Sequence, residues 1–284
     1  MRLSRILLWS ALLAATLLLG ACNEPEREVL RFGLNAMPNN LDPRFATDAA
    51  SYRINRLIYR QLVDFNEARK PVPALATWKR PGPKHYRFTL GPDQRTFDDG
   101  SRLPSRDVAA TYRYILDPDN ASPHRASVAM IERIETPDPD TVDFYLNRAD
   151  PLFPGYLVVG ILPAKLIDAG HAFQRAPVGS GPFKLAEWSD EGKLRLKRRR
   201  DGQEVEFLHV GNPTVRVLKL IRGEIDMLQN DLPRELVTYL AGQDEVRLQK
   251  ARGSNFAYLG FNLEDPVTGK LAVRRAIAHA IDRE

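Results

Sequence analysis

The chain has 284 residues, enough for one large domain or two of ordinary size, and 43% hydrophobic residues allow a substantial core. The net charge of +5 is spread along the sequence and not gathered in a basic block, which argues against nucleic acid as a partner. A single cysteine excludes an internal disulfide, so the fold depends on packing alone.

The amino-terminal segment has the pattern of an export signal. Arg2 and Arg5 precede an apolar run over 6–19, which is shorter than the roughly 20 residues of a membrane-spanning helix. We expect this segment to be removed, which lowers the net charge to +3. The run leads into "LLGAC", which ends at Cys22 and resembles the lipobox of bacterial lipoproteins. That resemblance implies a signal peptide over 1–22 and a lipid on Cys22. An ordinary secretory signal is the alternative.

The first half of the chain is predicted to combine short helices with antiparallel strands. Apolar residues at helical spacing indicate the helices, and the alternation in "KHYRFTL" is typical of a half-buried strand. In chain order we expect a strand at 29–34, a turn-rich loop at 37–43, a helix at 52–65, a strand at 84–90, a turn at Asp99-Gly100, a helix at 107–116 capped by Ser105, two strands within 131–146 and a buried connection at 151–163.

The second half begins at "APVGSGPFKLAEW" and alternates strands with helices, which predicts an α/β sheet. The basic run "KRRR" is interpreted as the outward side and end of a hairpin. In chain order we expect a strand at 193–200, a turn at Asp201-Gly202, a strand at 205–210, a helix at 214–222 ended by Gly223, a strand at 224–228, a helix at 233–240, a strand at 255–262 and a helix at 268–284.

The last predicted helix has an apolar face. Val273, Ile277 and Ile281 recur at helical spacing, and Thr268 is a candidate amino-terminal cap. No glycine, asparagine or proline follows to end the helix. We therefore expect this face to need a packing partner.

No constellation of catalytic or metal-binding residues stands out. Ser180 lies in "GSG" without the spacing of a nucleophile elbow, and no G-K-S/T follows "VGSGP". Asp98-Asp99 and Asp138/Asp140 are paired carboxylates, but each pair lies in a turn with glycine or proline. Turn formation accounts for these residues without a catalytic role. The histidines are scattered and form no zinc motif; they are His85, His124, His171, His209 and His279. We therefore expect a binding protein with no catalytic residue, metal or cofactor, and keep a secreted hydrolase as an alternative.

A series of short motifs runs through residues 29–284. In order they are "LDP", "IYRQLVDF", "PALATWK", "YRFTL", "FDDG", "SRDV", "DPDNASP", "TVDFYL", "PVGSGPFKLAEW", "RGEIDM", "LGFN" and "VRRAIAHAIDRE". Together they resemble the extracytoplasmic solute-binding proteins of family 5, which serve ABC importers of peptides, nickel and related solutes. "DPDNASP" and "GEIDMLQNDLP" are similar to the oligopeptide-binding branch. Gly91-Pro92 and "RRRDGQEVEF" depart from the family pattern. These departures bear on the expected loop shape and ligand class, and not on the expected fold.

The resemblance implies an α/β fold of the type II periplasmic-binding-protein kind, in which two lobes close on a ligand. Lobe I would comprise 23–44 and 171–268, and a small α+β domain would comprise 45–170. Residues 269–284 would begin lobe II, most of which is missing, so we expect a truncated product or fragment. The alternative is a naturally shortened protein whose partner supplies the missing surface.

The resemblance also implies a function and a set of contacts. The chain would capture peptides in the periplasm and deliver them to a membrane permease powered by a separate ATPase, with no nucleic acid partner. A nickel- or haem-type solute, a non-functional fragment and a transcriptional regulator are the alternatives; a signal peptide occupies the place of the regulator's DNA-binding helices. The expected ligand-binding residues are Met37, Pro38, Asn39, His124, Tyr258, Phe261 and Asn262.

Overall fold

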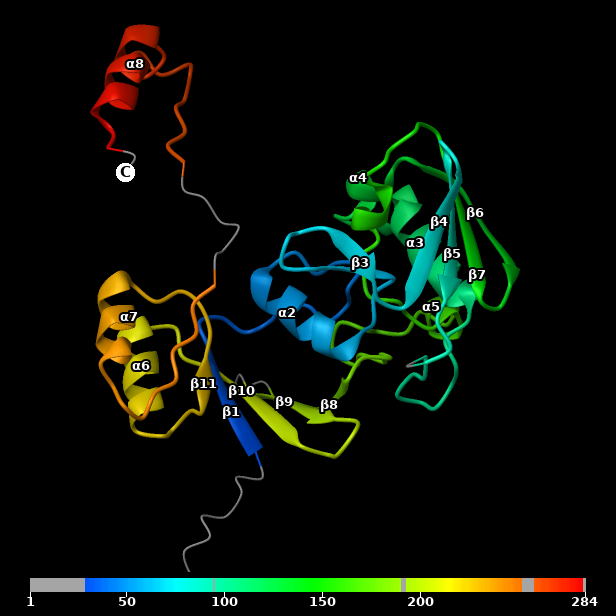
Figure 1. Ribbon diagram of the computed structural model, residues 1–284, viewed down its shortest axis with the longest axis horizontal. Helices are drawn as coiled ribbons and strands as arrows, with labels where there is room; N and C mark the ends of the chain where they lie inside the picture. The colour runs from blue at the N-terminus through cyan, green and yellow to red at the C-terminus, as the bar shows by residue number, and fades with distance from the viewer. Residues whose placement is uncertain (1–28, 94, 190–192, 252–257, 283–284) are drawn as a thin grey trace, which may run out of the picture. The chain divides into compact units, whose positions relative to one another are not determined.

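The computed structural model describes residues 29–93, 95–189, 193–251 and 258–282 (Figure 1). It divides the chain into a first unit that ends at Gly242 and a second unit from Gln243 onward, each described here by itself. The expected signal segment and Cys22 lie outside the described residues. Within the described ranges, no helix has both the length and the apolar character that crossing a membrane requires.

A five-stranded mixed sheet is built from the two ends of the first unit. Its order is β11-β1-β10-β9-β8 (Figure 1). β1 is parallel to both of its neighbours, and β10, β9 and β8 follow one another antiparallel. The strands are β1 (Val29–Leu34), β8 (Phe183–Trp188), β9 (Lys193–Arg198), β10 (Glu204–His209) and β11 (Met227–Leu228). Leu194, Leu196 and Phe207 are buried on one face with Leu34, as the alternation in the sequence predicts.

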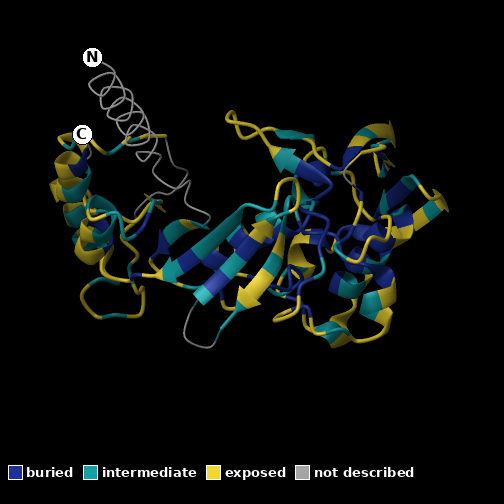
Figure 2. Ribbon diagram, turned by 90° about the horizontal axis from the view of Figure 1, so that it is seen from below, coloured by how far each residue is buried: buried dark blue, intermediate teal, exposed yellow. Residues whose placement is uncertain are grey.

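The middle of the first unit forms an antiparallel sheet with the order β4-β5-β7-β6. Phe88 and Phe144 pack edge to face, with ring centroids 5.5 Å apart, and Tyr112 of α3 contacts Phe144 in the same way. Buried and more exposed residues alternate along β5, which leaves one face of the strand in the core. Figure 2 shows the same kind of alternation along the central strands of the five-stranded sheet. The elements are β4 (Ala76–Gly82), β5 (His85–Leu90), α3 (Ser105–Leu116), β6 (Ile131–Asp138) and β7 (Thr141–Leu146).

Short elements connect the two sheets and complete the first unit. They are α2 (Ala49–Ile58), β2 (Val63–Phe65), β3 (Pro71–Pro73), η1 (Pro118–Asn120), α4 (Arg125–Val128), η2 (Phe153–Tyr156), α5 (Ala164–Asp168), α6 (Pro213–Ile221) and α7 (Arg234–Ala241). The side chain of Asn212 caps α6, and Gly223 has a φ of 65° just after its end, as the sequence predicts for that glycine.

The glycines of "VGSGP" mark a close crossing of two backbones. The N–H of Gly181 donates to the carbonyl of Ile58, at 2.7 Å, where α2 ends. A Cβ on Gly179 would come within 2.0 Å of that same oxygen, and a Cβ on Gly181 within 2.4 Å of the carbonyl oxygen of Leu57. Only glycine fits at these two positions, so the motif serves backbone packing.

Three predicted features differ from the structure in this first unit. The helix predicted over 52–65 spans Ala49–Ile58, because Tyr59 is extended and the chain turns into β2. Ser105 is the first residue of α3 and not its cap; Pro104 occupies the cap position, and the Ser105 hydroxyl donates to the carbonyl of Asp138. The strand predicted over 224–228 is reduced to β11.

The second unit contains α8 (Leu271–Ala280), none of whose residues is buried. Lys270 and not Thr268 occupies the cap position. Thr268 instead belongs to the preceding turn, where its N–H donates to Asp265 Oδ1 at 2.8 Å. The strand predicted over 255–262 is not formed at 258–262, and residues 255–257 lie outside the described residues.

Candidate functional site

The loop that carries "LDP" is held by a buried ion pair. Arg44 Nη2 lies 2.6 Å from Asp42 Oδ2, and both side chains are almost completely buried. The guanidinium of Arg44 also lies over the ring of Tyr114 in α3, 3.7 Å from its centroid. Because the two charges neutralise each other inside the protein, the loop contributes a rigid wall without a net charge.

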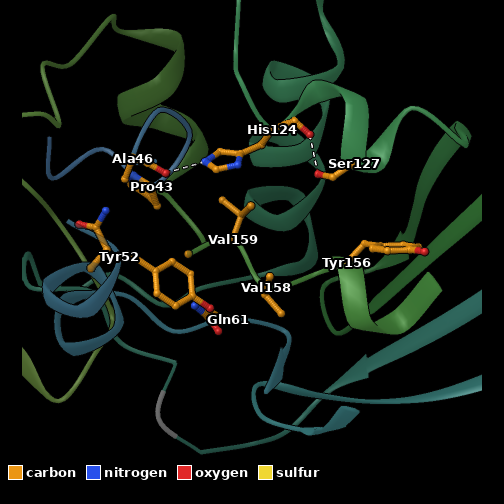
Figure 3. Close-up of a pocket in the computed structure, with 11 residues that line it drawn as sticks. Pro43, Ala46, Tyr52, Gln61, His124, Ser127, Tyr156, Val158 and Val159 are labelled. Carbon is orange, nitrogen blue, oxygen red and sulfur yellow. Dashed lines mark hydrogen bonds between the residues drawn. The ribbon is translucent and has the colours of Figure 1, made fainter. Parts of the chain in front are cut away.

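Two hydrogen bonds join this loop to the segment before α4. Ser122 Oγ donates to the carbonyl of Arg44 at 2.7 Å. His124 Nε2 lies 2.9 Å from the carbonyl oxygen of Ala46 (Figure 3). A carbonyl only accepts, so Nε2 carries the hydrogen and Nδ1 is the acceptor of the neutral ring. The loop and the predicted ligand-binding residue His124 are thus held in one arrangement.

A pocket with a volume of about 180 Å³ lies beside His124 (Figure 3). Its walls come from the loop of Arg44, from α2 and the residues after it, from α4 and the residue before it, and from the end of η2 and the segment that follows. The lining residues are Pro43, Ala46, Tyr52, Asn55, Gln61, His124, Ser127, Tyr156, Val158, Val159 and Gly160. Apolar and aromatic groups with a few polar ones are typical of a small-molecule site.

None of the lining residues is Asp, Glu, Lys or Arg, so the pocket wall carries no carboxylate, ammonium or guanidinium group. Asn55 is only 6% exposed, and neither atom of its amide has a hydrogen-bond partner in the described part of the chain. Gln61 is 9% exposed, and its amide likewise has no partner among the residues described. A fully buried amide without a partner, as at Asn55, is uncommon and suggests that a bound group completes it.

The first three predicted contacts lie in the loop after β1 and do not line the pocket. Pro38 is buried, Met37 packs against the core of the five-stranded sheet and Asn39 is exposed. The N–H of Asn39 donates to Ser51 Oγ at 2.9 Å. The structure therefore brings His124 to the pocket and keeps this tripeptide apart from it.

The other predicted contacts belong to the second unit. Tyr258 is 83% exposed and Phe261 is half-buried. The side chain of Asn262 accepts a hydrogen bond from the N–H of Glu264 at 3.1 Å. These contacts remain predictions.

Several pocket residues were not predicted from the sequence. Tyr52 and Asn55 are three residues apart on α2, and Gln61 lies within the "IYRQLVDF" motif. The signal that the sequence offered for these residues was the position of Tyr52 and Asn55 beside apolar residues at helical spacing. Their meeting with Tyr156 and Val158, about a hundred residues later, depends on tertiary structure and leaves no local trace.

Comparison with known proteins finds binding proteins that align with nearly the whole chain. A dipeptide-binding protein of Pseudomonas aeruginosa is 26% identical, over 99% of this chain and 59% of its own length. The periplasmic binding protein DppA of Helicobacter pylori, solved with the peptide STSA, is 26% identical with a TM-score of 0.77, over 89% of this chain and 56% of its own. The chain thus spans a little over half the length of these relatives.

A third protein of known structure has a fold similar to that of this chain. NikZ of Campylobacter jejuni, solved with Ni(L-His), has a TM-score of 0.79 at 22% identity, over 90% of this chain and 54% of its own. Together the structural matches confirm the predicted α/β fold of the type II periplasmic-binding-protein kind.

The family assignment rests on a separate comparison. A family model described as "Bacterial extracellular solute-binding proteins, family 5 Middle" matches residues 70–284, well over half of the chain. This agrees with the resemblance of the motifs from "PALATWK" onward. The chain therefore belongs to the family 5 bacterial extracellular solute-binding proteins.

Proposed function

We propose that this chain is the substrate-binding part of an ABC importer and that it captures peptides for a membrane permease and its ATPase. Membership of family 5 supports a role in solute binding. Two relatives, a dipeptide-binding protein and DppA with a bound peptide, favour peptides as the solute. The observation that carries the proposal is the uncharged pocket beside His124.

The chemistry of the pocket favours a peptide over a metal complex. Apolar walls at Val158 and Val159 offer room for a side chain, and the amides and the imidazole offer hydrogen bonds. Among the lining residues, His124 alone has a side chain that commonly ligates nickel. Peptides are recognised largely through their main chain, with pockets that accept side chains.

The wider site and the location remain parts of the proposal. We infer that lobe I comprises 23–44 and 171–268, that the small domain comprises 45–170 and that residues from 269 begin lobe II. The other contacts would come from Met37, Pro38 and Asn39 and from Tyr258, Phe261 and Asn262. The protein would act in the periplasm, held to a membrane by a lipid on Cys22.

Calorimetric titration of the full chain with a library of di- to pentapeptides tests the function. We expect at least one peptide to bind, and His124→Ala to weaken that binding by about tenfold through loss of a lining group. His171→Ala is the matched control, because His171 Nε2 also donates to a backbone carbonyl, that of Ala176, and the pocket does not include it. Absence of binding by every peptide would overturn the proposal, as would an equal effect of the two substitutions.

A further inference from the structure

The charge of the pocket bears on which peptides it selects. None of its lining residues is Asp, Glu, Lys or Arg. Asp42 and Arg44, which flank the lining residue Pro43, are buried and paired with each other. A carboxylate or ammonium group entering the pocket would lose water without gaining an opposite charge. An uncharged group avoids that cost.

The amide of Gln61 limits which uncharged ligand groups suit the pocket. Its side chain lies in the pocket wall with Tyr52 and Val158 (Figure 3), and it offers one acceptor and two donor hydrogens with no partner among the described residues. A purely apolar ligand group would cover this amide without pairing either function, which is unfavourable. Another amide presents the complementary donor and acceptor together. Asn55 adds a second buried amide to the same wall.

We propose that this pocket selects an uncharged, amide-bearing group of the ligand and that Gln61 is the residue that determines this specificity. The inference rests on the proposed peptide function and names the ligand chemistry of the same site. The amide can come from a glutamine or asparagine side chain or from the peptide main chain, and the experiment separates these sources.

The test uses trialanine with one residue replaced, at each position in turn, by glutamine, glutamate or methionine. These side chains have nearly the same shape and differ in charge and hydrogen bonding. Calorimetry on the full chain should show that glutamine at one position binds about tenfold more tightly than glutamate or methionine. Gln61→Met should remove this advantage. The exposed Gln174, outside the pocket, provides the control Gln174→Met, which should keep it.

One further variant and the remaining outcomes complete the test. Gln61→Glu places a carboxylate in the pocket, so this variant should bind a lysine-containing tripeptide more tightly than its glutamine counterpart. Circular dichroism checks that the Gln61→Met and Gln61→Glu variants are folded. If Gln61→Met weakens every peptide equally, the amide comes from the main chain and the proposal stands. If the wild-type chain binds the glutamate peptides more tightly than the glutamine peptides, or if Gln61→Met changes nothing, the proposal is overturned.

A second arm separates this inference from the peptide function. Saturation-transfer NMR compares isobutyramide with isobutyrate on the full chain. An isobutyramide signal that Gln61→Met abolishes, together with no peptide binding, would overturn the peptide function and keep the amide site. Equal signals from the amide and the acid, or none from either, in a chain that also binds no peptide would overturn both.

Discussion

Arg44 Nη2 lies 2.6 Å from Asp42 Oδ2, and this buried ion pair is part of the loop that forms one wall of the pocket. Arg44→Met should lower the free energy of unfolding by about 3–5 kcal/mol, because it leaves the carboxylate of Asp42 buried without its partner. Urea denaturation followed by circular dichroism measures the change. The double variant Asp42→Asn/Arg44→Met should recover part of the loss, and a single variant as stable as wild type would contradict the buried pair.

The crossing at Gly181 predicts a second large effect. Gly181→Ala places a methyl group 2.4 Å from the carbonyl oxygen of Leu57, so two backbone segments must separate. Overpacking of this kind usually costs about 1–3 kcal/mol, and the rigidity of backbone places this case at the upper end or above. Gly91→Ala is the control, because its Cβ would lie an ordinary 3.6 Å from the carbonyl oxygen of Leu75, the nearest atom beyond the two chain neighbours of Gly91. Equal melting temperatures for the two variants would refute the crossing.

The limits of sequence reasoning are visible where α2 ends. β1 was predicted at its observed bounds, because its strand pattern is local. The apolar spacing of Leu57, Ile58 and Leu62 predicted a helix that continues to 65. The carbonyl of Ile58 instead accepts from Gly181, more than a hundred residues away. The same kind of distant contact assembles the pocket, so Gln61 was not predicted as a pocket residue although it lies within the motif "IYRQLVDF".

Asp107 in α3 makes stability depend on pH. Burial raises the pKa of its carboxyl to about 6, although the N–H of Ala164 donates to Oδ1 at 2.9 Å and opposes the shift. The folded state therefore binds this proton more tightly than the unfolded state. This contribution to stability is present below the unfolded pKa of about 4 and is lost as the pH rises through 6.

Asp107→Asn tests this assignment. It keeps an acceptor for Ala164 and removes the titration, so it should flatten the loss of stability between about pH 4 and pH 6, a loss of at most about 3 kcal/mol in the wild-type chain. Denaturant unfolding at several pH values measures it. Asp64→Asn, at a carboxylate far more exposed than that of Asp107, should leave the slope in place. A slope that survives in Asp107→Asn would assign it to another group.

Filling the pocket should block binding without unfolding the protein. Val158 is half-buried and lines a space of about 180 Å³, so the larger side chain of Val158→Phe can occupy that space while the core remains intact. We expect peptide affinity to fall by tenfold or more, with a melting temperature close to that of wild type. Val215→Phe is the matched control, because Val215 lies exposed on α6 and outside the pocket. Retention of full affinity by Val158→Phe would mean that ligands bind elsewhere on the chain, since a phenyl ring at this position leaves little room for a side chain.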